Sequence, residues 1–286
     1  MPGPESINTV KNLMKEYKLF PKKKWGQNFL VDGNILNKIA NACDSGTDEF
    51  VVEIGPGLGA LTRQLAIRSQ GVLSIEIDQS LQEPLQAVLD DCPNARLLFA
   101  DVLKVDIETE LKKAFNLEQV PRYQVCANIP YNITTPIIFQ LLENCPHMIA
   151  ATLMMQKEVA RRIVAKPGNK EYGLLTLMMT YYSDVELLMK VSHNCFYPKP
   201  EVDSSVIRIT PLPEKRVQVQ DEQRFRDFCR AAFQKRRKTI LNICSSFFEM
   251  DKGEVETHLQ SLSIPPANRP ENLSIQEFAS IADKLT

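Results

Sequence analysis

The amino-acid sequence predicts an α/β fold with a mostly parallel β-sheet, followed by a small all-α domain. Short β-branched runs alternate with helical segments from about residue 34 to 155, which is typical of βαβ units. Two further strand-like runs, at 185–191 and 205–209, have no helical segment between them and indicate a C-terminal antiparallel hairpin at the sheet edge. Beyond residue 213 the strand pattern disappears.

The elements of the α/β part follow from apolar periodicity and from the turn residues that bound each segment. We expect helices over 35–42, 60–68, 80–89, 107–115 and 136–142. We expect strands over 49–54, 72–77, 96–99, 123–127, 149–155, 185–191 and 205–209. Residues 1–28 are polar and rich in lysine, and we assign no element to them.

Four short segments with apolar faces predict the helical domain. Ser274 and Glu277 fit a capping box at the start of one of them. Pro211 and Pro213 interrupt the chain before the first, so we expect an α/β domain over 1–212 and a small helical domain over 213–286. The four expected helices are 224–233, 238–248, 254–262 and 274–284.

Composition excludes several classes of protein. The 286 residues include 34 Lys+Arg and 35 Asp+Glu, so the net charge of −1 excludes a uniformly basic protein, and any nucleic-acid surface must come from local clustering. The seven cysteines are scattered without a C-x-x-C pair, which predicts reduced thiols and no metal site. Neither a long apolar run nor a signal sequence is found, so we expect a cytoplasmic protein that does not bind a membrane.

A glycine-rich loop follows the first expected strand of the sheet. Gly55, Gly57 and Gly59 lie where a buried strand turns into a helix, at the edge where ligands bind in open α/β sheets. Glu76 ends the second strand, 21 residues after Gly55, where a carboxylate can accept hydrogen bonds from both ribose hydroxyls. Asp101 follows the third strand and can accept a hydrogen bond from an adenine amino group. These strand ends together predict a nucleoside site.

The same loop allows other interpretations. Gly55-x-Gly57-x-x-Ala60 loosely fits the dinucleotide fingerprint of nicotinamide-dependent dehydrogenases. A structural tight turn is the plainer alternative for the loop, as is a cap of the next turn for Asp101. Two details disfavour a nicotinamide enzyme. With Glu53, the loop resembles the Glu-x-Gly-x-Gly-x-Gly loop of class I S-adenosylmethionine methyltransferases, and no second mononucleotide-binding half follows.

The tetrapeptide Asn-Ile-Pro-Tyr at 128–131 follows the fourth strand at the same edge. An exocyclic adenine amine is a poor nucleophile, because its lone pair is delocalised into the ring. The side-chain oxygen of Asn128 and a backbone carbonyl can accept its two hydrogens and favour a tetrahedral nitrogen. Pro130 stiffens the loop, and Tyr131 can stack on a base removed from its helix. The tetrapeptide resembles the [DNS]-[IP]-P-[YFW] loop of amino-methyltransferases.

Five motifs occur in the order found in the ribosomal RNA adenine N6,N6-dimethyltransferases, a family that the chain resembles over nearly its whole length. Thr135-Pro136 and the run 236–239 are more similar to the small-subunit KsgA type than to the erythromycin-resistance methylases of the large subunit. Mitochondrial transcription factor B relatives share much of the pattern, but no transit peptide rich in Arg and Ser is found. The motifs are 24–30, 53–59, 76–78, 128–136 and 196–204.

The resemblance implies a Rossmann-like class I methyltransferase with S-adenosylmethionine as its cofactor. It implies dimethylation of two adjacent adenines in the 3′-terminal stem-loop of small-subunit ribosomal RNA, during maturation of a pre-ribosomal 30S-like particle, by a monomer. An erythromycin-resistance-type methylase of large-subunit RNA is one alternative. A non-catalytic ribosome-assembly or transcription factor on the same fold is another.

The resemblance also implies site residues. Gln27 and Asn28 would close over the methionine end of the cofactor, and Ile77 would pack on its adenine. Asn128 would orient the target amine with the carbonyl of Ile129 as second acceptor. The full cofactor-binding set is Gln27, Asn28, Leu30, Gly55, Gly57, Glu76, Ile77, Asp101, Val102 and Asn128. The catalytic set is Asn128 with Tyr131 and Phe196, whose two rings would sandwich the target base.

Basic residues cluster in two separate segments. Seven basic residues and one acid, Asp227, lie between 224 and 238, and lysines are frequent near the N-terminus. A solvated helix face is the plainer interpretation, but two clusters beside a base pocket predict a phosphate-binding surface with salt-sensitive affinity. We therefore expect the helical domain over 213–286 to bind RNA or the ribosome. The expected RNA-binding residues are Lys22, Lys23, Lys24, Lys199, Arg224, Arg226, Lys235, Arg236, Arg237 and Lys238.

Overall fold

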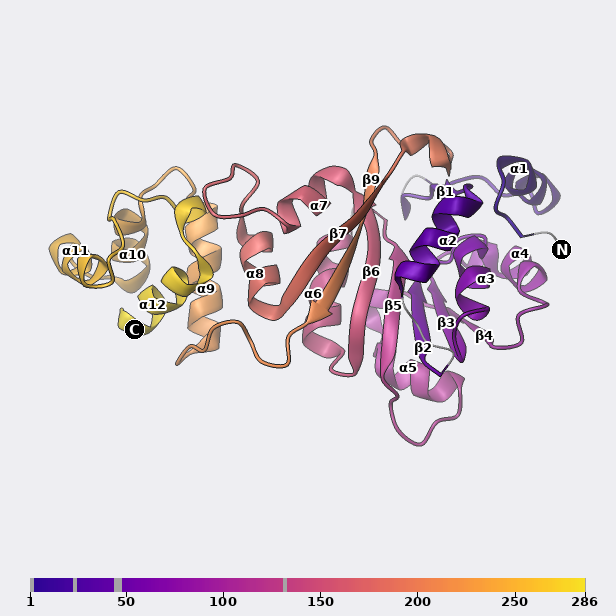
Figure 1. The fold of residues 1–286 in the computed structure, drawn as a ribbon, viewed down its shortest axis with the longest axis horizontal. Helices are drawn as coiled ribbons and strands as arrows, with labels where there is room; N and C mark the ends of the chain where they lie inside the picture. Colours follow the sequence, from indigo (N-terminus) through magenta and orange to yellow (C-terminus); the bar gives the residue numbers. More distant parts are fainter. Residues whose placement is uncertain (1–2, 23–24, 44–47, 131–132, 286) are drawn as a thin grey trace. The chain divides into compact units, whose positions relative to one another are not determined.

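The computed structural model describes residues 3–22, 25–43, 48–130 and 133–285 (Figure 1). They form two compact units. The first contains the chain up to Ala160 together with Glu186–Pro211, and the second contains Arg161–Val185 together with the chain from Leu212 onwards. The second unit therefore includes 161–185, a segment that the division at 212/213 assigns to the first domain.

The first unit contains a seven-stranded sheet with the order β4-β3-β2-β5-β6-β9-β7. The strands from β4 to β6 are parallel, β9 runs antiparallel to β6, and β7 lies at the edge beside β9. The mostly parallel sheet expected from the sequence is confirmed. The strands are β2 (Phe50–Ile54), β3 (Gly71–Glu76), β4 (Ala95–Phe99), β5 (Tyr123–Asn128), β6 (Met148–Gln156), β7 (Ser183–Val191) and β9 (Ser204–Pro211).

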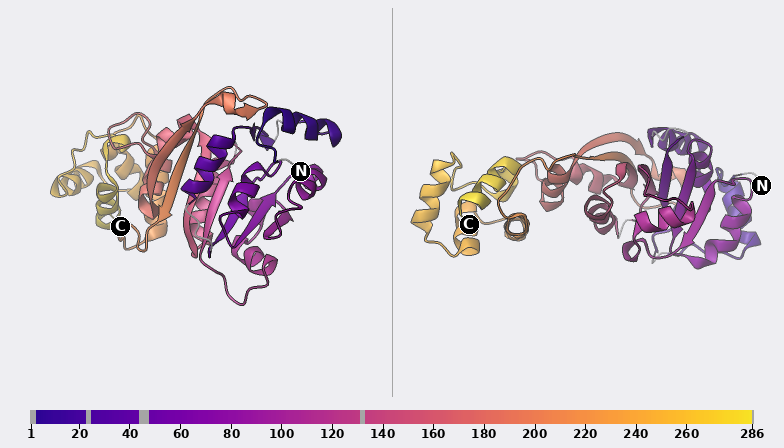
Figure 2. Two further views of the ribbon diagram at one scale, coloured as in Figure 1. Left: turned by 45° about the vertical axis from the view of Figure 1, so that its right-hand side comes forward. Right: turned by 90° about the horizontal axis from the view of Figure 1, so that it is seen from below.

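Helices cover both faces of this sheet, as the turned views in Figure 2 show. Every residue of β2 and β3 is buried, which is the reason that these strands are nearly continuous apolar runs in the sequence. The helices are α2 (Gly33–Ala42), α3 (Ala60–Ala66), α4 (Gln82–Val88), α5 (Ile107–Ala114) and α6 (Thr134–Asn144), and the short 3₁₀ turns are η2 (Gln79–Leu81), η3 (Val102–Lys104) and η4 (His193–Cys195).

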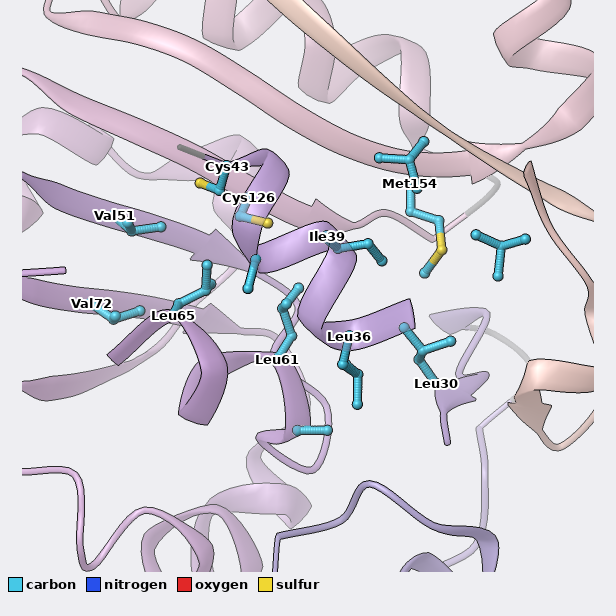
Figure 3. Close-up of a cluster of buried hydrophobic side chains, with 14 of the residues drawn as sticks. Leu30, Leu36, Ile39, Cys43, Val51, Leu61, Leu65, Val72, Cys126 and Met154 are labelled. Atoms are coloured by element: carbon cyan, nitrogen blue, oxygen red, sulfur yellow. The ribbon is translucent and has the colours of Figure 1, made fainter. Parts of the chain in front are cut away.

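One core cluster joins α2 and α3 to the sheet (Figure 3). Both helices direct apolar side chains onto β2, β3 and β5, and burial of these side chains fixes where each following loop leaves the sheet. The side chains of this cluster include Leu36, Ile39, Leu61, Leu65, Val51, Val72 and Cys126.

The lysine-rich N-terminal segment contains a helix that the sequence analysis did not assign. In α1 (Ile7–Glu16), the side chains of Val10, Leu13 and Met14 are buried against α4, and the Ser6 hydroxyl accepts a hydrogen bond from the Thr9 N–H at 3.2 Å. An isolated apolar stripe of three residues in a polar segment is a weak periodic signal, and packing against α4 decides the conformation.

The second unit is helical. Its 161–185 segment includes α8 (Leu174–Tyr182), which is apolar on all sides and therefore lacks the periodicity that identifies a helix from sequence. The Ser274–Glu277 capping box is present, with the Glu277 carboxylate accepting from the Ser274 N–H at 2.7 Å. The helices are α7 (Lys157–Ile163), which begins in the first unit, α8, α9 (Glu222–Gln234), α10 (Ile240–Phe248), α11 (Lys252–Ser261) and α12 (Ile275–Lys284), with η5 at Pro270–Asn272.

Within the part of the chain that the structure describes, no helix combines the length and the apolar character needed to cross a bilayer.

Candidate active site

One pocket lies at the carboxyl edge of the parallel strands of the first unit. The loops after β2, β3, β4 and β5 form its walls, together with the N-terminal segment 25–30. All ten residues predicted to bind a cofactor line this pocket, although each comes from one of five separate stretches of sequence. They are Gln27, Asn28, Leu30, Gly55, Gly57, Glu76, Ile77, Asp101, Val102 and Asn128.

The glycine loop turns through left-handed backbone conformations. The φ angles of Gly55, Gly57 and Gly59 are +74°, +59° and +83°, which other residues rarely adopt. A Cβ atom on Gly57 would lie 3.1 Å from Cδ1 of the Phe29 ring. The loop therefore needs glycine for both its conformation and its close packing.

Glu76 is a buried carboxylate at the end of β3. Its Oε1 accepts a hydrogen bond from the Asp78 N–H at 2.9 Å, and its Oε2 accepts one from the Gly57 N–H at 3.2 Å. Burial raises the pKa of Glu76, and these backbone donors oppose the rise. Because each carboxylate oxygen can accept a second hydrogen bond, the group retains capacity for the two hydroxyls of a ribose.

Glu53, in β2, is a buried pocket residue to which the sequence analysis gave no contact with a ligand. It lines the pocket and is 1% exposed. Its Oε2 accepts hydrogen bonds from the hydroxyls of Thr62, at 2.6 Å, and Ser74, at 2.8 Å. Burial raises the pKa of Glu53 to about 7. Thr62 and Ser74 come from α3 and β3, so no sequence spacing relates them to Glu53.

Lys22 and Gln27 attach the N-terminal part of the chain to the pocket rim through Asp78. This carboxylate accepts hydrogen bonds from Lys22 Nζ and from Gln27 Nε2, both at 2.7 Å. Burial would raise the pKa of Asp78, but hydrogen bonds from Lys22, Ser80 and Gln27 outweigh burial and lower it. The structure thus places Lys22, which we expected to bind RNA, in an ion pair within the protein. Lys23 and Lys24 lie outside the described residues.

Asn128 is the last residue of β5 and lines the pocket. Its Nδ2 donates a hydrogen bond to the backbone carbonyl of Asn28 at 3.2 Å. Because the side-chain amide is planar, this bond turns Oδ1 away from Asn28. The next residue, Ile129, is held by its N–H, which donates to the Met154 carbonyl at 3.0 Å. Tyr131, expected to stack on the target base, lies outside the described residues.

Asp101 and Ile77 meet the pocket from the ends of β4 and β3. The Asp101 Oδ1 accepts a hydrogen bond from the Leu103 N–H at 3.1 Å, so this carboxylate caps η3 as the plainer interpretation held, and it also lines the pocket. Ile77 is 41% exposed, unusually high for an isoleucine, and presents an apolar face at the rim. This pair of a carboxylate and an apolar face suits a purine ring.

Comparison with known proteins places these observations in a family. A family model described as ribosomal RNA adenine dimethylase matches residues 20–286. The chain belongs to this family. Ribosomal RNA small subunit methyltransferase A from Moorella thermoacetica is 44% identical over 275 residues, which cover 96% of this chain and 95% of that protein. The protein of the same name from Bacillus mycoides is 42% identical over 281 residues, with 97% and 96% covered.

Solved structures agree with the dimethylase assignment. A dimethyladenosine transferase from Plasmodium falciparum superimposes with a TM-score of 0.71 at 25% identity, covering 87% of this chain and 94% of that one. The 23S rRNA methyltransferase ErmE gives a TM-score of 0.69 at 27% identity, covering 90% and 99%. The predicted class I methyltransferase fold is thereby confirmed.

Phe196 is placed differently from the expectation that its ring flanks the target base of the dimethylase. It lies in the short strand β8 (Phe196–Tyr197), opposite Leu30 of β1 (Phe29–Leu30). Its side chain is 3% exposed and belongs to the core cluster of α2 and α3. Stacking on a base needs an accessible ring face, and in this structure the ring of Phe196 is covered by the core. Its contact with the target base stays a prediction.

The other basic residues expected to bind RNA in this dimethylase remain at the surface. Lys199 is exposed, and in the second unit all but the half-buried Arg226 are exposed as well. Arg236 donates hydrogen bonds to the carbonyls of Lys170 and Tyr172, both at 3.0 Å, which joins the turn after α9 to the 161–185 segment. RNA contact by these residues stays a prediction. The exposed members of the second unit are Arg224, Lys235, Arg236, Arg237 and Lys238.

All seven cysteines of the dimethylase chain are free thiols. Among the residues that the structure describes, no three His, Cys, Asp or Glu side chains converge to hold a metal ion.

Proposed function

We propose that this chain transfers methyl groups from S-adenosylmethionine to N6 of adenine in small-subunit ribosomal RNA. One observation carries the proposal. Asn128, the group suited to orient an adenine amine, lines the same pocket as Glu76 and Asp101, the carboxylates suited to bind a nucleoside. The relatives with 42–44% identity are named small-subunit methyltransferases, whereas ErmE, named for 23S rRNA, is 27% identical.

The residues of the pocket fit S-adenosylmethionine. Glu76 offers two carboxylate oxygens for ribose hydroxyls, and Asp101 and Ile77 offer an acceptor and an apolar face for adenine. The left-handed glycine loop lets its backbone approach the ligand. Gln27 and Asn28 line the pocket from the N-terminal segment, where they would close over the methionine end. The bound cofactor supplies a methyl group on a sulfonium sulfur, which is an excellent leaving group.

The chain contributes orientation to the reaction. The Asn128 side-chain oxygen and the Ile129 carbonyl accept the two hydrogens of the adenine amine. This favours a tetrahedral nitrogen whose lone pair is available to the methyl group. Because the sulfonium sulfur leaves readily, positioning supplies much of the remaining catalysis, and a general base with a tuned pKa is not required.

The finer features of the proposal follow from the family. The target is a pair of adjacent adenines in the 3′-terminal stem-loop of the small-subunit RNA, within a pre-ribosomal 30S-like particle in the cytoplasm. The enzyme acts as a monomer. The exposed basic residues of the second unit, with Lys199 of the first, contact RNA phosphates, and such contacts make the affinity fall as salt rises.

An assay of methyl transfer tests this function. The purified chain is incubated with S-adenosylmethionine labelled in its methyl group and with unmethylated small-subunit particles, naked small-subunit RNA or large-subunit RNA. The expected result is N6,N6-dimethyladenosine in the small-subunit substrates. Methylation of large-subunit RNA alone would identify a resistance-type methylase instead. Cofactor binding without transfer to any substrate would indicate a non-catalytic assembly or transcription factor, and binding of NAD in a titration would indicate a dehydrogenase.

A further inference from the structure

The outer face of α1 and the turn that follows it form a basic surface with one aromatic side chain. Lys11 and Lys15 are exposed and, being four residues apart, share one face of the helix. Lys18 is exposed beyond the helix end, and Phe20 is 81% exposed. We call these four residues the α1 surface. Val10, on the buried side of the same helix, lines the candidate pocket, so the α1 surface lies on a helix that also forms part of the pocket wall.

The end of α1 fixes the direction of Phe20. Lys18 has a left-handed backbone with φ of +50°, and the Leu19 N–H donates to the Met14 carbonyl at 2.8 Å, as in a Schellman motif. Leu19 packs against the cluster of α1 and α4. The turn therefore directs Leu19 inward and leaves the next side chain, Phe20, in solvent.

Neither Lys18 nor Phe20 is the residue that folding alone would favour at its position. A left-handed helix end favours Gly or Asn, because a side chain with a Cβ is strained there. A phenylalanine that stays in solvent gains nothing from the hydrophobic effect. Neighbouring residues that each disagree with local folding preference indicate a functional surface.

The charge of this surface selects the partner. Residues 7–22 contain four lysines and one acid, Glu16. Lys22 is paired with Asp78, and Lys11 Nζ lies 5.2 Å from the centre of the Tyr197 ring. Across the described residues, no ion pair is found for Lys15 or Lys18. Exposed lysines beside an exposed aromatic ring match single-stranded nucleic acid, whose phosphates and bases these groups bind.

We infer that the α1 surface binds unpaired nucleotides of the RNA that flank the target adenine. Phe20 stacks on one base, while Lys15 and Lys18 contact phosphates. This inference rests on the proposed function, since it takes the RNA substrate as the ligand. It assigns base stacking to Phe20, which belongs neither to the predicted cofactor-binding residues nor to the basic residues of the second unit.

Direct RNA binding tests the inference separately from methyl transfer. Four variants are compared with the wild type: F20A, F20W, the double variant K15Q/K18Q, and I67A. Ile67 is 74% exposed elsewhere in the first unit and serves as the matched apolar control. Affinity for a fluorescent, unmethylated 3′-terminal stem-loop RNA and for unmethylated small-subunit particles is measured over a salt series. Cofactor affinity is measured by calorimetry, and the association state by sedimentation velocity.

Loss of one stacked base predicts RNA affinity roughly 5- to 150-fold weaker in F20A, with an unchanged salt slope. F20W and I67A should bind RNA as the wild type does. K15Q/K18Q should lower the slope of log affinity against log salt by roughly 1 to 2. All variants should keep wild-type cofactor affinity.

Three results would overturn the inference. In the first, the wild type methylates and binds RNA, and F20A matches it in both assays, which leaves the proposed function standing. In the second, F20A loses cofactor affinity in step with RNA affinity, which indicates a structural role. In the third, the wild type is a dimer that F20A dissociates, which assigns the surface to self-association. A wild type that neither binds nor methylates RNA overturns both proposals.

Discussion

Asn128 and Asn28 are joined by a hydrogen bond from the side-chain amide of the first to the backbone carbonyl of the second, 3.2 Å long. The bond links the carboxyl end of β5 to the N-terminal segment, which is also held at Asp78 by Lys22 and Gln27. The orientation of the Asn128 amide therefore depends on a segment 100 residues away in sequence. Under the proposed function, orientation of the target amine by Asn128 therefore depends on the position of Asn28.

The first prediction concerns N128A. Loss of one positioned polar group should lower turnover by roughly 10²–10³. The measurement is kcat under saturating RNA and S-adenosylmethionine, with protein stability checked by thermal unfolding. N144A, which changes an exposed asparagine at the end of α6, is the matched control and should keep wild-type turnover. Wild-type kcat in N128A would remove the orienting role from this side chain.

A second prediction follows from Glu76. E76A removes an acceptor of two hydrogen bonds from backbone N–H groups and of those from ribose, so cofactor affinity should fall by about 1.5–3 kcal/mol per charged hydrogen bond lost. Ribose hydroxyls bind the ionised carboxylate better. Because burial raises the pKa of Glu76, affinity should also decline as pH falls through that raised pKa. Calorimetric titration at several pH values measures both effects. The control is E83Q, which neutralises an exposed carboxylate in α4 and should change neither the affinity nor its pH dependence.

Much of the candidate site could be predicted because its residues follow the ends of parallel strands. Glu76, Asp101 and Asn128 each end or follow an expected strand, and parallel strands bring their carboxyl ends to one edge. The pocket of the structure contains all three. Strand identity alone was enough to bring them together, without knowledge of side-chain packing.

The features that the sequence did not predict are those that tertiary contacts decide. Lys22 resembles its neighbouring lysines in sequence, and only the fold shows that Asp78 lies within 2.7 Å of its Nζ. Phe196 is part of a recognisable motif, but its pairing with Leu30 across β1 and β8 buries the ring. The helix α8 has no amphipathic period, because both of its sides are covered. None of these contacts produces a local sequence pattern from which it could have been predicted.

The third prediction separates conformation from packing in the glycine loop. G57A places a Cβ 3.1 Å from the Phe29 ring, in a backbone with φ of +59°. G168A, with φ of +84° and nothing within 4 Å of the added Cβ, is the control for the conformational cost alone, which is about 1–2 kcal/mol. We expect G57A to lower the free energy of unfolding more than G168A does, and to weaken cofactor binding. Equal losses in chemical denaturation would show that contact with Phe29 adds nothing.

The fourth prediction concerns the pH dependence of stability through Glu53. Its pKa rises from 4.5 to about 7 in the folded chain, so the folded state binds the proton more tightly than the unfolded state. This contribution to stability is complete below pH 4.5 and is lost as pH rises to about 7, an amount on the order of 3 kcal/mol. E53Q cannot ionise and keeps an acceptor for Thr62 and Ser74. The free energy of unfolding of the wild type minus that of E53Q should therefore decrease as pH rises from 4.5 to about 7. A difference constant from pH 4.5 to 7.5 would contradict the prediction.

The last prediction distinguishes two lysines that the sequence grouped together. Lys22 holds the N-terminal segment to Asp78, whose side chain is 2% exposed, so K22Q should destabilise the first unit by about 1–3 kcal/mol and weaken cofactor binding. Lys199 is exposed, so K199Q should leave stability and cofactor affinity unchanged and should reduce the salt slope of RNA binding by roughly 0.7 to 0.9. Thermal unfolding, cofactor titration and RNA binding over a salt series measure these effects. If K22Q lowered only the salt slope, Lys22 would act as a phosphate ligand, and its bond to Asp78 would have no energetic role.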